Sequence, residues 1–143
     1  MTRAEYFLEL WHYWLKRLRL KEIPIRNDYR YHCHACVESW EDGKRELVYN
    51  SRRLRKWDKY LLINCCFHEI GHLKNDLPYD TEEEQVHSEY KAERYALTMM
   101  RKYYPKELKT VVHHVKTKNM NKSRWIKKNP IHYQAYLKIK EYN

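Results

Sequence analysis

The stretch CCFHEIGHL, residues 65–73, places two histidines four positions apart, with a glutamate directly after the first. It belongs to a run over about residues 52–74 whose apolar and histidine positions share the i, i+3, i+4, i+7 spacing of one helical face: Leu54, Leu61, Cys65, His68 and His72. We predict a long helix from about Arg52 to Lys74, with Ser51 as its N-cap. Both histidines then point the same way as the apolar face of this helix.

The segments around this helix predict a mostly helical α+β domain. Two strand-like runs between about residues 29 and 50 flank Asp42 and Gly43, a pair typical of hairpin turns, and predict a small antiparallel sheet packed by the helix. Capping boxes predict helices that begin near Thr2 and Thr81, the second running to about Tyr104. Two further helices are expected. One covers Lys106 to Val115, and the other begins at Asn129 as N-cap and Pro130 as first helical residue. We expect one domain over residues 1–143.

The helical spacing of the opening stretch is typical of a zinc-hydrolysis site. Such a site needs imidazole donors that converge on one point, a third protein ligand and a free position for water. Spacing of four brings His68 and His72 together on one face, and Glu69 lies beside them as a candidate general base. Gly71 adds to this pattern, because a glycine inside a helix costs about 0.5–1 kcal/mol relative to alanine and indicates a close backbone approach.

The third ligand is expected from the next helix. Glu89 and Glu93 lie four residues apart in SEYKAERYAL, residues 88–97, and so share a face. We favour Glu89 as the ligand and Glu93 as the carboxylate that accepts the other N–H of a metal-binding histidine. Glu93, His87 and the Glu82 to Glu84 cluster remain alternative ligands. Without a metal, the same residues are polar side chains of a helix seam and solvated helix charges.

On these residues the chain resembles the ImmA/IrrE family of intracellular zinc metallopeptidases, a gluzincin-type group of phages, mobile elements and bacterial stress responses. The likeness covers about residues 45–100: a strand ending in LVYN, a helix into FHEIGH, and a downstream E-x-x-A-x-x-x-A pattern that begins at Glu89. Where the family often has Asn or Asp after the first alanine of that pattern, this chain has Glu93.

The resemblance implies a zincin-like fold and the hydrolysis of a peptide bond. It implies that His68, His72 and Glu89 bind Zn²⁺ and that Glu69 is the general base, with helix-turn-helix repressors as substrates. Many such sites also use a group that stabilises the oxyanion. The sequence offers several candidates for that role: Tyr79, His87, Tyr90, His113, His114 and His132. An edge strand of the hairpin is a further place where an extended substrate is expected to pair.

Positive charge is concentrated in the last third of the chain. Residues 1–100 contain 17 Lys and Arg and 17 Asp and Glu, whereas residues 101–143 contain 12 and 2. We expect a basic helical appendage over about residues 106–143, with a linker over residues 116–128. Arg124, Lys127 and Lys128 alternate with aromatic residues and are candidate nucleic-acid contacts, with a solvated helix face as the alternative.

The sequence is also compatible with two other functions. One is a non-catalytic, metal-stabilised nucleic-acid-binding module, and another is a SprT-like DNA-associated protease, which usually takes a third histidine as ligand. Cys33 and Cys36 invite a second metal, but a single C-x-x-C is weak evidence and we favour buried or edge thiols. The sequence has no signal-peptide or membrane-span pattern, so we expect a cytoplasmic protein that does not bind membranes.

Overall fold

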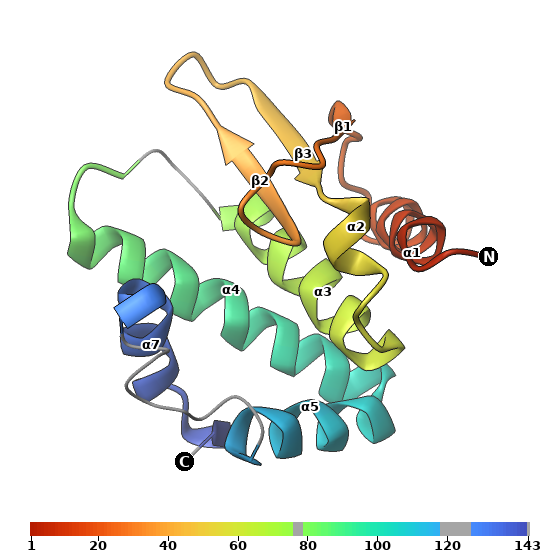
Figure 1. The fold of residues 1–143 in the computed structure, drawn as a ribbon. Helices are drawn as coiled ribbons and strands as arrows, with labels where there is room; N and C mark the ends of the chain where they lie inside the picture. The colour runs from red at the N-terminus through yellow and green to blue at the C-terminus, as the bar shows by residue number, and fades with distance from the viewer. Residues whose placement is uncertain (76–78, 118–126, 143) are drawn as a thin grey trace.

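The computed structural model describes residues 1–75, 79–117 and 127–142 and confirms a mostly helical α+β fold (Figure 1). Its elements follow the chain as α1 (Arg3–Arg17), β1 (Ile25–Asn27), β2 (Ala35–Ser39), β3 (Arg45–Tyr49), α2 (Ser51–Leu54), α3 (Lys59–Asn75), α4 (Glu82–Tyr103), α5 (Pro105–Thr117), α7 (Pro130–Leu137) and a short 3₁₀ helix η1 (Lys140–Tyr142). The predicted linker falls mostly on residues 118–126, which lie outside the described residues.

The sheet has three strands in the order β1-β3-β2. The predicted hairpin is confirmed, since β2 and β3 pair antiparallel and Gly43 adopts the left-handed φ of +85° in the turn between them. The sequence did not predict the third strand: the three-residue β1 pairs parallel with β3 on its other side, so the sheet is mixed. A short hairpin turn cannot mark this pairing in the sequence, because β2 lies between β1 and β3 along the chain. As a result, β2 is an edge strand.

The predicted helix over residues 52–74 is divided into α2 and α3, and Ser51 is not its N-cap. The cap is Asn50, whose Oδ1 accepts hydrogen bonds from the backbone N–H groups of Arg52 and Arg53 at 3.1 and 3.3 Å. The chain turns between Leu54 and Lys59, where the Trp57 ring stacks on His34 at a centroid distance of 3.6 Å. The helix that carries the motif therefore begins only at Lys59.

Both predicted capping boxes begin helices where expected. The Thr2 and Thr81 hydroxyls each accept a hydrogen bond at 3.1 Å, from the N–H groups of Glu5 and Glu84 respectively. Asn129 precedes Pro130 at the start of α7 as predicted, but its side chain makes no capping bond. Local signals thus set the start of α1 and α4.

The main core lies between α1 and α3. Four apolar side chains of α1 are fully or almost fully buried: Phe7, Trp11, Trp14 and Leu15. Trp14 meets Phe67 of α3 edge-on, with ring centroids 5.0 Å apart. In Figure 1, α1 lies on one side of α3 and α4 runs across another. The face of α3 that contains Phe67 packs against α1. His68 is the next residue along α3 and lies on the side of the helix that meets α4.

The helices α3 and α4 cross closely at Gly71, where a glycine inside a helix had indicated a close backbone approach. A Cβ added there would lie 3.0 Å from the Ala92 Cα and 3.2 Å from the Ala92 carbonyl oxygen. Both neighbours are backbone atoms, which cannot move away without shifting α4. Gly71 therefore sets the separation between the helix of the histidines and the helix of Glu89.

Replacing Gly71 with alanine is expected to lower the free energy of unfolding by about 1–3 kcal/mol, since the clash with α4 outweighs the better helix propensity of alanine. Urea denaturation measures this change. Gly43→Asn is the control, because nothing lies within 4 Å of a Cβ there and asparagine tolerates a left-handed φ. An unchanged or raised stability of Gly71→Ala would contradict the role of this crossing.

The C-terminal segment packs back on α4. Ile139 and Tyr142 form a small second core with Leu97 of α4, and Arg101 pairs with Glu141 at 3.2 Å. This contact brings α7 and η1 next to the motif residues. Within the described residues, none of the helices combines the length and the apolar character needed to cross a bilayer.

Candidate metal centre

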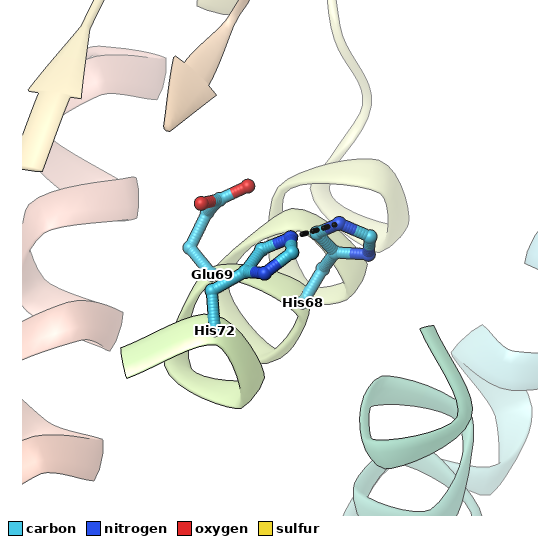
Figure 2. Close-up of side chains that lie close together, drawn as sticks. All are labelled: His68, Glu69 and His72. Carbon is cyan, nitrogen blue, oxygen red and sulfur yellow. Dashed lines mark hydrogen bonds between the residues drawn. The ribbon is translucent and has the colours of Figure 1, made fainter. Parts of the chain in front are cut away.

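Three side chains from two helices converge beside the α3–α4 crossing. The Nε2 atoms of His68 and His72 lie 3.2 Å apart. The Glu89 carboxylate of α4 places Oε2 at 2.9 Å from the His68 Nε2 and Oε1 at 3.2 Å from the His72 Nε2. Figure 2 shows one nitrogen of each ring turned toward the other ring, with Glu69 beside them. The three residues favoured as ligands from the sequence are therefore brought together by the fold.

The donor distances are close to those around one bound metal ion. In a tetrahedral site with zinc–nitrogen and zinc–oxygen bonds near 2.0–2.2 Å, neighbouring ligand atoms lie about 3.3 Å apart. The separations between His68, His72 and Glu89 are 2.9–3.2 Å. The donor atoms of His68, Glu69 and His72 also all lie within 4.8 Å of one another. The donor atoms of His68, His72 and Glu89 thus need to move only slightly to surround a single ion.

The hydrogen bonding of His68 supports the same conclusion. Its Nδ1 lies 2.7 Å from the Glu93 Oε2, and an ionised carboxylate only accepts, so this nitrogen carries a proton. In a neutral His68 ring the Nε2 then has no proton, and its lone pair faces a lone pair of the Glu89 Oε2. Two lone pairs at 2.9 Å repel unless a proton or a metal ion lies between them. The residues present therefore fit a cation at this point.

The pKa values indicate how strongly the centre favours positive charge. Burial opposes protonation of His68, but its hydrogen bonds to Glu89 and Glu93 outweigh burial and raise its pKa well above the usual range. Burial likewise acts to raise the pKa of Glu89, yet hydrogen bonds from His132, His68 and His72 hold that pKa far below its usual value. The two carboxylates remain ionised around the imidazole.

Glu69 lies beside the donors, buried to 5% exposure. Its Oε2 accepts a hydrogen bond of 2.7 Å from the backbone N–H of Val37, on the edge strand β2. Burial raises the pKa of Glu69, although the nearby His72 and His68 act in the opposite direction. A carboxylate with a raised pKa takes up a proton more readily, which is what a general base must do.

A group of outer partners fixes the orientation of the two rings. Besides His68, the Glu93 carboxylate binds the Asn64 amide at 3.2 Å and the Tyr142 hydroxyl at 2.7 Å, both through Oε1. On the other ring, the His72 Nδ1 lies 3.2 Å from the Ser88 hydroxyl. Glu93 thus contacts the Nδ1 of His68, the nitrogen that does not face the other donors, as the sequence led us to expect. Asn64, Ser88 and Tyr142 were not anticipated, although a polar Asn64 inside the apolar run from Leu61 to Phe67 was a usable signal.

The other candidate ligands point elsewhere. The His87 ring lies 6.3 Å from that of Tyr90, and Glu84 accepts the Asp80 N–H at 3.2 Å. Glu82 and Glu83 line a separate hollow with Gln134 and Lys138. None of these residues has a described contact with His68 or His72.

Among the candidates for oxyanion stabilisation, His132 of α7 is placed next to the donors. Its Nε2 lies 3.2 Å from the Glu89 Oε2, and its side chain is 50% exposed. Tyr79 lines a hollow that also includes Glu89 and His132. The Tyr90 hydroxyl accepts a hydrogen bond from Arg94. His114 lines a cavity together with His68 and Glu89, but its Nδ1 lies 3.5 Å from the Tyr60 hydroxyl. His132 therefore combines proximity to the donors with access to solvent.

The structure gives little support for a second metal site at the cysteines or for a nucleic-acid site at the basic residues. The four thiols are free, and the one described group of at least three metal-binding side chains includes none of them. Burial raises the pKa of Cys33 and of Cys36, which disfavours the thiolate that binds metals. Arg124 lies outside the described residues, while Lys127 and Lys128 are exposed and Lys128 lines the hollow beside Glu89.

No family model matches the chain, and comparisons with curated proteins and with solved structures find no match.

Proposed function

We propose that the protein is a zinc-dependent metallopeptidase of the ImmA/IrrE type that its motif resembles. In this proposal His68, His72 and Glu89 bind Zn²⁺, and Glu69 is the general base. The observation that carries it is the convergence of two imidazoles and one carboxylate at 2.9–3.2 Å, with a buried glutamate beside them. We also infer a cytoplasmic location and a protein substrate such as a DNA-bound helix-turn-helix repressor.

Each side chain has a part in the hydrolysis. Bound zinc would supply a Lewis acid that polarises the peptide carbonyl and makes a water molecule easier to deprotonate. Glu69, held by the Val37 N–H, takes the proton from the attacking water and passes it to the leaving amine. The His132 N–H faces the Glu89 Oε2 at 3.2 Å; with Glu89 committed to the metal, this N–H becomes available to donate to the carbonyl oxygen as that oxygen gains negative charge. Glu93 keeps the His68 Nδ1 protonated, so that its Nε2 faces the metal position.

Two features favour this function over a non-catalytic zinc module and over a SprT-like protease. A structural zinc site has four protein ligands and no use for a buried carboxylate beside them, whereas Glu69 is held there by a backbone hydrogen bond. A SprT-like site usually takes a third histidine, but here the group facing both His68 and His72 is the carboxylate of Glu89.

The proposal is tested by metal analysis of the purified chain, followed by cleavage assays on a peptide library. We expect about one zinc per chain, cleavage that is lost on treatment with 1,10-phenanthroline, and recovery when zinc is restored. A chain that binds no zinc when the metal is supplied, or cleavage that persists after the metal is removed, would overturn the proposal.

Replacing Tyr142 with phenylalanine is expected to weaken zinc binding by about 10-fold, the lower end of the effect of outer partners. The change removes the hydroxyl that donates to Glu93 and leaves the ring in the second core. Competition with a chromogenic chelator measures the affinity. Tyr13→Phe is the control, since that hydroxyl accepts from Arg17 on the exposed side of α1. Equal affinities in both variants would show that Tyr142 does not position His68 through Glu93.

A further inference from the structure

A cavity of about 200 Å³ adjoins the metal centre between α3, α4, α5 and α7. Its wall includes His68 and Glu89, so the cavity and the convergent donors are continuous. Six apolar residues form one part of the wall: Trp57, Leu61, Val111, Val115, Ala135 and Ile139. The other part also includes six polar residues: Asn64, Glu93, His114, His132, Tyr136 and Tyr142. The mechanism proposed above makes no use of this space.

Most polar groups in the cavity wall already have a partner, including His132, which faces Glu89, and His114, which lies 3.5 Å from the Tyr60 hydroxyl. Asn64 and Tyr142 both donate to Glu93, and Glu93 in turn binds His68. A polar or charged group that entered the cavity would lose its water and gain few partners, whereas an apolar group would lose nothing. The wall therefore favours an apolar occupant.

The volume limits the occupant to about one side chain. A cavity of about 150 Å³ lined by Leu, Ile and Phe is known to bind benzene, so the roughly one-third larger space here accepts a side chain the size of Leu, Met or Phe. Because His68 and Glu89 are part of its wall, the backbone of a residue seated in the cavity lies beside the donors.

We propose that this cavity is the specificity pocket of the enzyme and seats an apolar side chain of one of the two residues that flank the cleaved bond. This inference rests on the proposed function and adds the substrate class: protein segments with Leu, Met or Phe at the cleavage site. An acidic residue is disfavoured there, because the carboxylates of Glu89 and Glu93 lie in the wall and repel a second carboxylate.

The pocket is tested by binding of hydroxamic acids to the zinc-loaded chain, measured by calorimetry. A hydroxamate with an isobutyl group is expected to bind roughly tenfold tighter than acetohydroxamate, and one with a carboxymethyl group no tighter. Ala135→Phe fills the pocket from α7 and Val111→Phe fills it from α5, and each should reduce the isobutyl advantage to less than about threefold. Leu137→Phe is the control, because that residue is 50% exposed on α7 and does not line the pocket.

The outcomes separate this inference from the proposed function. Cleavage sites in a peptide library should show Leu, Met or Phe enriched at one flanking position, and both filling variants should shift that preference to Ala or Gly. Zinc-dependent cleavage without such a preference, or an isobutyl advantage that both filling variants retain, overturns the pocket and leaves the peptidase. A chain that binds neither zinc nor any hydroxamate overturns both.

Discussion

Replacing Glu69 with glutamine is expected to lower kcat/KM for peptide cleavage by roughly 10²–10⁴-fold, the usual contribution of a general base, while the chain keeps about one zinc. The amide has nearly the same shape as the carboxylate, so its oxygen still accepts the Val37 N–H. It cannot take up the proton of the attacking water. Glutamine is a sharper probe than alanine, because removing a side chain buried to 5% exposure would leave a cavity beside His72.

Zinc content and cleavage are measured on the same preparation of Glu69→Gln. Glu9→Gln makes the identical chemical change at an exposed position of α1 and should cleave like the unmodified chain. Undiminished cleavage by Glu69→Gln would refute the general-base role and leave the metal centre in place. Loss of both zinc and cleavage would instead assign Glu69 to metal binding.

Much of this fold was predictable because its signals are local. The capping boxes at Thr2 and Thr81 each involve a hydroxyl and an N–H three residues away, so the sequence specifies them directly. The placement of His68 and His72 on one face likewise follows from the helical repeat alone. Gly71 was informative because an unfavourable residue in a helix interior needs a compensating contact, and α4 provides it.

The errors and omissions involve contacts between distant parts of the chain. The parallel pairing of β1 with β3 bypasses β2, and no turn between them marks it. The break before Lys59 accompanies the stacking of Trp57 on His34, a contact that helical periodicity does not reveal. Tyr142 reaches Glu93 across 49 residues of sequence. Periodicity describes the surface of one element, whereas these contacts depend on how two elements meet.

Zinc is expected to raise the Tm of the chain by roughly 10 °C, and Glu89→Ala is expected to remove most of that rise. A ligand present at 1,000 times its Kd stabilises the fold by about 4 kcal/mol, and at this chain length each kcal/mol shifts the Tm by about 2–4 °C. Glu89 is the donor that links α4 to the two histidines of α3, so without it the ion no longer joins the helices.

The zinc-dependent shift, rather than the Tm itself, is the quantity to compare between variants. Without metal, Glu89 still forms hydrogen-bonded pairs with His68, His72 and His132, so its removal also destabilises the metal-free chain. Glu83→Ala, at an exposed position in the first turn of α4, should keep the full shift. Magnesium should produce none, because it prefers six oxygen ligands to two imidazoles and one carboxylate. A zinc shift that survives Glu89→Ala would place the third ligand on another residue, and His132, at 3.2 Å from that carboxylate, is the next to replace.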